Sequence, residues 1–155
     1  MNWSDKKLKE YSEEHIFYEV QMLIKTRDHF PIAAKAGWIQ KMTAIESFVI
    51  HLRCLITFLY PTSKRFDRDV RAEDFFSDPS GWNDTKPELP LSLKKARERA
   101  NREVGHLTED RKGIGDPEKE WPINQLADEI IPILKFFCSS ADGNKLSEKV
   151  MTLLN

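Results

Sequence analysis

Apolar side chains recur at helical spacing along most of the chain, so the pattern predicts α-helices throughout. The first predicted helix runs from about Asp5 to Arg27, with Ser4 as its N-cap and Pro31 just beyond its end. Its buried stripe is formed by Leu8, Tyr11, Ile16, Val20, Leu23 and Phe30. Strands would show an alternation of period two, and we find no segment that favours it.

The second predicted helix, from about Ala34 to Tyr60, is the most apolar part of the chain, and Pro61 would end it. Between Ile45 and Leu59 its apolar residues cover nearly the whole circumference. A helix that is apolar all round is typical of the centre of a bundle or of an oligomer interface.

A long connection, residues 61–91, is rich in Pro, Asp, Ser and Gly. Loops of this length are usually functional or partly structured. We expect this one to pack against the bundle, with a short turn near residues 72–76. The apolar residues available for that packing are Val70, Phe75, Phe76 and Trp82.

Three further helices follow the connection, and the first of them begins after Pro90 with Ser92 as the candidate N-cap. They span about residues 92–111, 122–139 and 145–154. The sequence therefore predicts a single all-α domain over residues 1–155. Its architecture is an antiparallel bundle of four main helices plus a short C-terminal helix, with a long connection between the second and third helices.

Composition and net charge limit the ways in which this chain could bind a polyanion. The chain has 155 residues, of which 40% are hydrophobic and 32% charged, as in an ordinary globular domain. The formal net charge is −1, so polyanion binding would require a local basic patch rather than bulk attraction.

The two cysteines, Cys54 and Cys138, lie inside apolar helical segments, which favours buried thiols in a reducing compartment. A metal site is not expected, because the sequence has no Cys-x-x-Cys and no His pair at helical spacing. The N-terminus is charged rather than apolar, and we find no apolar run of membrane-spanning length. We therefore expect a cytoplasmic protein that does not enter a membrane.

Within the apolar second helix, Glu46 and Arg53 are seven residues apart and share a face, which Thr57 extends. His51 lies on a different face of this helix, more than a right angle away. If these charges are buried, each needs a partner on another helix. The candidates are Glu14 and Glu19, or Asn101 and the arginines of the third helix. Glu46 and Arg53 belong to a structural polar network, lie on an edge of the helix that reaches solvent, or form a phosphate-binding cleft that contains Arg53.

The third helix is strongly basic at its centre, with five basic residues against one Glu between Lys94 and Arg102. Arg99 lies seven residues before His106 and Arg102 four before it, so all three share a face. An Arg that holds a phosphate beside a His that moves a proton can form a metal-free ribonuclease site. The alternative is a solvated face stabilised by ion pairs four residues apart.

Two segments, Ala44–Arg53 and Asn101–Thr108, resemble small prokaryotic proteins of the HEPN type (higher eukaryotes and prokaryotes nucleotide-binding). That resemblance implies a helical bundle of the kind found among abortive-infection and toxin proteins. In active members, an Arg followed by four to six residues and a His forms a metal-independent endoribonuclease site, commonly across a dimer interface. Here six residues separate Arg99 from His106 and three separate Arg102 from it, and Arg99 is followed by Ala100 where the family prefers a polar residue.

The resemblance implies that His106 transfers the proton and that Arg99 or Arg102 contacts the phosphate. Residues expected to line or support the same cleft are Glu46, Arg53, Asn101, Thr108 and Arg111. The first functional hypothesis is a metal-independent endoribonuclease, homodimeric and without a cofactor, that acts on RNA as an abortive-infection or toxin-type effector. The alternative is a non-catalytic module that binds a nucleotide or a protein partner such as an antitoxin, in which Phe75, Phe76 and Trp82 form a recognition surface.

Overall fold

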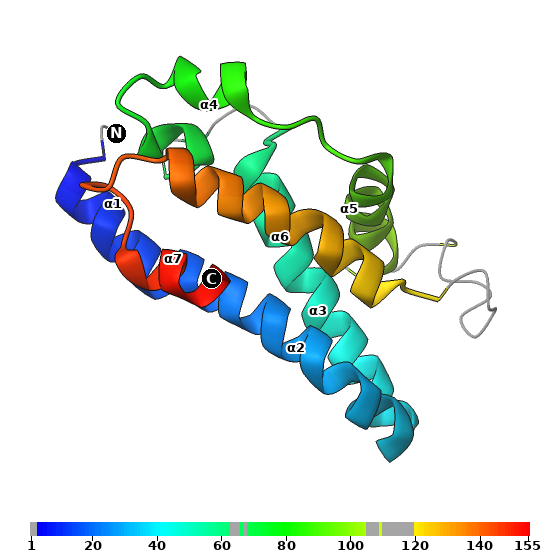
Figure 1. Cartoon of the computed structure of the whole chain (residues 1–155). Coiled ribbons are helices and arrows are strands. Elements are labelled where there is room, and N and C mark those ends of the chain that lie inside the picture. Colours follow the sequence, from blue (N-terminus) through cyan, green and yellow to red (C-terminus); the bar gives the residue numbers. More distant parts are fainter. Residues whose placement is uncertain (1–2, 63–65, 67, 105–108, 110–119) are drawn as a thin grey trace.

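The computed structural model describes residues 3–62, 66, 68–104, 109 and 120–155. In that part of the chain every regular element is a helix, which confirms the predicted all-α bundle (Figure 1). The core is one continuous cluster of apolar side chains to which all the main helices contribute.

The first predicted helix is longer than its sequence pattern indicates. It consists of α1 (Asp5–Tyr11), the π-helical turn η1 (Ser12–Ile16) and α2 (Phe17–Ala36), which follow one another without a break. The expected end before Pro31 is wrong, because Pro31 lies inside α2. Ala33 beyond it is buried, so packing holds this last turn in the helix despite the proline.

The π-helical turn is fixed by Ser12, whose side chain is fully buried. Its hydroxyl donates to the Lys9 carbonyl at 2.8 Å and accepts from the backbone N–H of Ser147 at 2.9 Å. Ser147 is the N-cap of α7 (Glu148–Leu154), so one hydroxyl joins the widened turn to the C-terminal helix.

Helix α3 (Trp38–Leu59) pairs with α2 as an antiparallel hairpin whose end, around Gly37, extends beyond the rest of the bundle (Figure 1). Gly37 has φ of 131°, a backbone conformation that L-residues with side chains rarely adopt, which permits the abrupt reversal. Trp38, directly after it, is 71% exposed.

The sequence pattern predicts that this helix is apolar nearly all round. In the structure, however, one face of α3 is exposed. Residues at i, i+4, i+7, i+8 and i+11 share a helix face, and one such set on α3 is exposed. Its members are Glu46, Ile50, Arg53, Cys54 and Thr57. Helices α2, α5 and α6 pack against α3 from the other directions, so this face remains uncovered.

Helix α5 (Leu91–Glu103) packs against α3 and against α6 (Ile123–Ser140). Its N-cap is Pro90 and not Ser92, which lies within the first turn and donates its hydroxyl to Glu129 on α6. Helix α5 ends at Glu103, earlier than predicted, and residues 105–108 and 110–119 lie outside the described residues.

The long connection packs against the bundle, as predicted. It contains a short 3-10 helix, η2 (Ala72–Phe75), and a helix that the sequence pattern does not reveal, α4 (Ser80–Thr85). Phe75, Phe76 and Trp82 are all buried, and their rings pack around Phe137 of α6. These rings therefore cannot form the exposed recognition surface that the sequence analysis considers.

Among the described residues, α3 alone is long and apolar enough to cross a membrane by length and composition. Half of that apolar segment is buried within the bundle. A central helix of a folded domain meets the same criteria, so this is only weak evidence for a membrane span.

Trp82 fixes the connection to the end of α3. Its side chain is 1% exposed, and its indole Nε1 donates to the carbonyl of Leu59 at 2.8 Å. We expect Trp82→Ala to lower the free energy of unfolding by about 3–5 kcal/mol, because it removes a large buried ring and leaves a cavity. Trp38→Ala is the matched control and should change it by less than about 0.5 kcal/mol. Equal denaturation midpoints in urea for the two variants would contradict this account.

Candidate functional site

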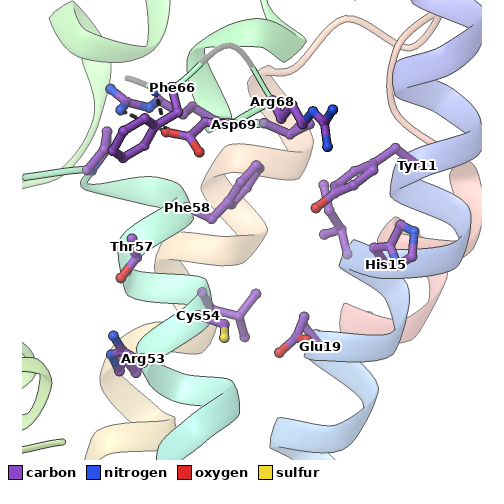
Figure 2. Close-up of a pocket in the computed structure, with 15 residues that line it drawn as sticks. Tyr11, His15, Glu19, Arg53, Cys54, Thr57, Phe58, Phe66, Arg68 and Asp69 are labelled. Atoms are coloured by element: carbon purple, nitrogen blue, oxygen red, sulfur yellow. Dashed lines mark hydrogen bonds and ion pairs between the residues drawn. The ribbon is translucent and has the colours of Figure 1, made fainter. Parts of the chain in front are cut away.

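A hollow of about 570 Å³ lies over the uncovered face of α3 (Figure 2). We call it the α3 groove. Its floor is formed by α3 residues Arg53, Cys54, Thr57 and Phe58, and one wall comes from the first helix. The segment that follows Pro61 closes one end through Phe66 and residues 68–71. Its volume is in the range of small-molecule sites.

The wall of the groove contains three polar side chains at successive helical turns, Tyr11, His15 and Glu19. The π-helical turn Ser12–Ile16 lies between Tyr11 and Glu19 and so sets how these side chains face α3. The rings of Tyr11 and His15 lie 4.7 Å apart. Single π-helical turns inside α-helices occur frequently at functional sites.

Glu19 is held by a histidine from the opposite helix. His51 Nδ1 lies 2.8 Å from Glu19 Oε2, and the side chain of His51 is buried. The edge of His51 meets Tyr18, with ring centroids 5.5 Å apart. The contact between His51 and Glu19 fixes the Glu19 carboxylate at the boundary between the core and the groove.

The charge of Glu19 affects the pKa of both Tyr11 and Cys54. Burial raises the pKa of Tyr11 above its ordinary value, and the charges of Glu19 and Cys54 raise it further. Burial and Glu19 also raise the pKa of the Cys54 thiol, whereas the guanidinium of Arg53 lowers it. Both groups therefore keep their protons at neutral pH and are available as hydrogen-bond donors.

The end of the groove carries cationic side chains. Arg68 is exposed and lies beside Tyr11 in Figure 2. Arg71 pairs with Asp69, with Nη2 and Oδ2 3.3 Å apart. Asp69 Oδ2 also accepts the backbone N–H of Phe66 at 2.9 Å, which shapes this part of the chain.

At the opposite edge of the groove, the side chain of Arg53 on α3 contacts α5. Arg53 Nε donates to Asn101 Oδ1 at 2.5 Å. The two segments that carry the resemblance, Ala44–Arg53 and Asn101–Thr108, thus meet at this hydrogen bond. Asn101 is one of the partners predicted for Arg53. Glu46 and Arg53 are both exposed, which agrees with the alternative that this edge of the helix reaches solvent.

Arg99 is engaged in contacts within the chain. Its Nε donates to Glu103 Oε2 at 2.7 Å, and its guanidinium stacks 4.1 Å from the ring centroid of Trp121. Arg102 is exposed on the same helix. His106, Thr108 and Arg111 lie outside the described residues, so the predicted catalytic grouping stays a prediction.

One of the two cysteines differs from its predicted environment. Cys138 is buried on α6, as expected, and burial raises its pKa to about 12. Cys54 is exposed in the α3 groove, so the expectation that both thiols are buried is wrong. The described part of the chain has no group of three or more His, Cys, Asp or Glu side chains arranged to hold a metal ion.

Tyr11, Phe58 and Arg68 line the groove but are not among the site residues predicted from the sequence. Their signal is weak, because Tyr11 falls on the apolar stripe of the first helix and Phe58 on that of the second. Comparisons of the chain with protein-family models, curated proteins and solved structures found no match.

The electrostatics of the groove predict the reactivity of Cys54. Arg53→Ala removes the charge that lowers the pKa of Cys54, so maleimide labelling of this thiol should become slower at neutral pH. Glu19→Gln removes a charge that raises the same pKa and should make labelling faster. Buried Cys138 serves as the internal control and should label only after unfolding. Unchanged Cys54 rates in both variants would contradict this electrostatic assignment.

Proposed function

We propose that this protein is a HEPN-like RNA-binding protein that cleaves RNA without a metal ion at the junction of α3 and α5. The observation that carries the proposal is the hydrogen bond between Arg53 and Asn101, because it brings the two HEPN-like segments together. The basic residues of α5, with Arg102 exposed among them, supply a local charge that attracts phosphates despite the net charge of −1.

Arg53 is suited to a phosphate contact. Among its interactions with described residues, only Nε is engaged, and its acceptor is a neutral amide. A guanidinium has five N–H donors, so Asn101 orients the group and leaves donors for phosphate oxygens. Arg102, next to Asn101 in the chain, would supply a second cation.

His106, four residues after Arg102, is the proposed proton-transfer residue. In one step the ribose 2′-oxygen loses its proton and bonds to the adjacent phosphorus, while the bond from phosphorus to the 5′-oxygen breaks. The leaving oxygen takes up a proton, and the products are a 2′,3′-cyclic phosphate and a 5′-hydroxyl. His106 would remove the first proton or supply the second, and Arg53 and Arg102 would stabilise the phosphoryl charge.

We expect the purified protein to cleave single-stranded RNA in the presence of EDTA. His106→Ala should lower the rate by about 10²–10⁴-fold, the usual contribution of general acid–base catalysis. Arg53→Ala should lower it by about 10²–10³-fold, because it removes a donor to the developing charge. The assay follows a labelled RNA on denaturing gels and identifies the cyclic phosphate end.

Lys135→Ala is the control, because Lys135 is exposed on α6 and does not line the groove. All variants should melt with the wild type within a few degrees. Full activity in His106→Ala would show that His106 does not transfer the proton. Full activity in Arg53→Ala would show that RNA is not cleaved at the α3–α5 junction.

A second candidate function is a non-catalytic module that binds RNA, a nucleotide or a protein partner at the same junction. The contacts of Arg99 favour it, because Glu103 and Trp121 hold this guanidinium in a structural role. Under this proposal the protein binds RNA, and Arg53→Ala weakens binding, yet no cyclic phosphate forms. The homodimer and the antitoxin partner are further proposals that rest on the resemblance.

A further inference from the structure

We propose that the α3 groove is a guanine-binding pocket that holds the base next to the phosphate bound by Arg53. This inference rests on the proposed function and extends it, because it assigns a base preference to RNA recognition. Arg53 belongs to both regions: it lines the groove and its guanidinium reaches Asn101 on α5. A nucleotide whose phosphate lies at Arg53 can therefore place its base in the groove.

The groove has the surfaces that a planar base requires. Phe58 is half-buried, and its ring is fixed by edge contacts with Phe75 and Phe137, at centroid distances of 5.9 Å and 5.3 Å. Tyr11 faces it from the first helix in Figure 2. Aromatic rings held in this way give a base a stacking surface, which every base can use. Stacking alone would not discriminate between bases.

Discrimination comes from Glu19. Its carboxylate lines the groove and is fixed by buried His51, so it presents acceptors at a defined position. The pairing edge of guanine has two adjacent N–H donors, N1–H and N2–H, which match a carboxylate. Adenine presents the N1 acceptor there, which a carboxylate repels. Cys54 lines the groove, keeps its proton and can donate to an acceptor of guanine, O6 or N7.

The exposed thiol on the floor of the groove provides the assay. Guanosine 3′-monophosphate and guanosine 5′-monophosphate are tested separately, because the position of the phosphate relative to the base is what Arg53 and Arg68 would read. At saturation, at least one of them should slow maleimide labelling of Cys54 by five-fold or more, whereas either adenosine monophosphate should slow it by less than two-fold. Titration calorimetry with the same nucleotides gives the affinities.

Glu19→Gln should weaken guanosine monophosphate binding by about ten-fold, because the amide replaces one acceptor with a donor. It should not weaken adenosine monophosphate binding, because the same donor removes the repulsion of the adenine N1 acceptor. Cys54→Trp, read by calorimetry, fills the groove from an exposed position and should abolish nucleotide binding even if Glu19→Gln disturbs His51. Lys135→Ala is the matched control and should bind as the wild type does.

The outcomes separate this inference from the proposed function. If the wild type cleaves RNA but neither guanosine monophosphate protects Cys54, the base pocket is overturned and the ribonuclease proposal stands. If guanosine monophosphate binds in the groove but RNA stays intact, the pocket is supported and the cleavage proposal fails. Equal protection by adenosine and guanosine monophosphates overturns the role of Glu19 in base selection.

Discussion

Helix α3 lies at the centre of the packing of this bundle. This helix supplies the largest share of the buried side chains, and α2, α5 and α6 all pack against it. Since these neighbours cover only part of its circumference, one face is left open to solvent. The same helix therefore holds the core together and forms the floor of the α3 groove. Substitutions on the buried face should therefore lower stability more than substitutions on the open face.

Much of this fold can be predicted from the sequence, because apolar residues at helical spacing indicate which segments form helices. In the stripe predicted for the first helix, Tyr11 and Phe30 are only partly buried, and the other four residues are buried. The extension of α2 through Pro31 could not be predicted, because local propensity opposes it and only packing of the following turn stabilises it. The sequence left the exposed face of α3 as one of several alternatives, since residues such as Ile50 and Cys54 are apolar yet lie where no neighbouring helix reaches.

The candidate site was predictable only in part. The spacing of Glu46, Arg53 and Thr57 correctly predicts that they share one face of α3, and Asn101 was among the predicted partners of Arg53. By contrast, the wall of the groove depends on the π-helical turn at Ser12–Ile16, which Ser12 stabilises through a contact with Ser147. That contact joins residues far apart in the sequence, so no local pattern reveals it. The pairing of Glu19 with His51 is equally non-local, although Glu19 itself was a candidate partner for the charges of α3.

The contacts of the two arginines decide which one is better placed to meet a phosphate. Arg99 donates to the carboxylate of Glu103 and stacks on Trp121, so a phosphate would have to displace an ion pair and a ring contact. Arg53 donates to the uncharged amide of Asn101, so this contact lacks the Coulomb attraction between opposite charges that holds Arg99 to Glu103. A phosphate can therefore compete for Arg53 at a lower cost, or bind its remaining donors while Asn101 keeps the guanidinium in place. Under the proposed function, phosphate recognition would therefore centre on Arg53 at the edge of α3 rather than on Arg99, and the RNA would run toward the α3 groove.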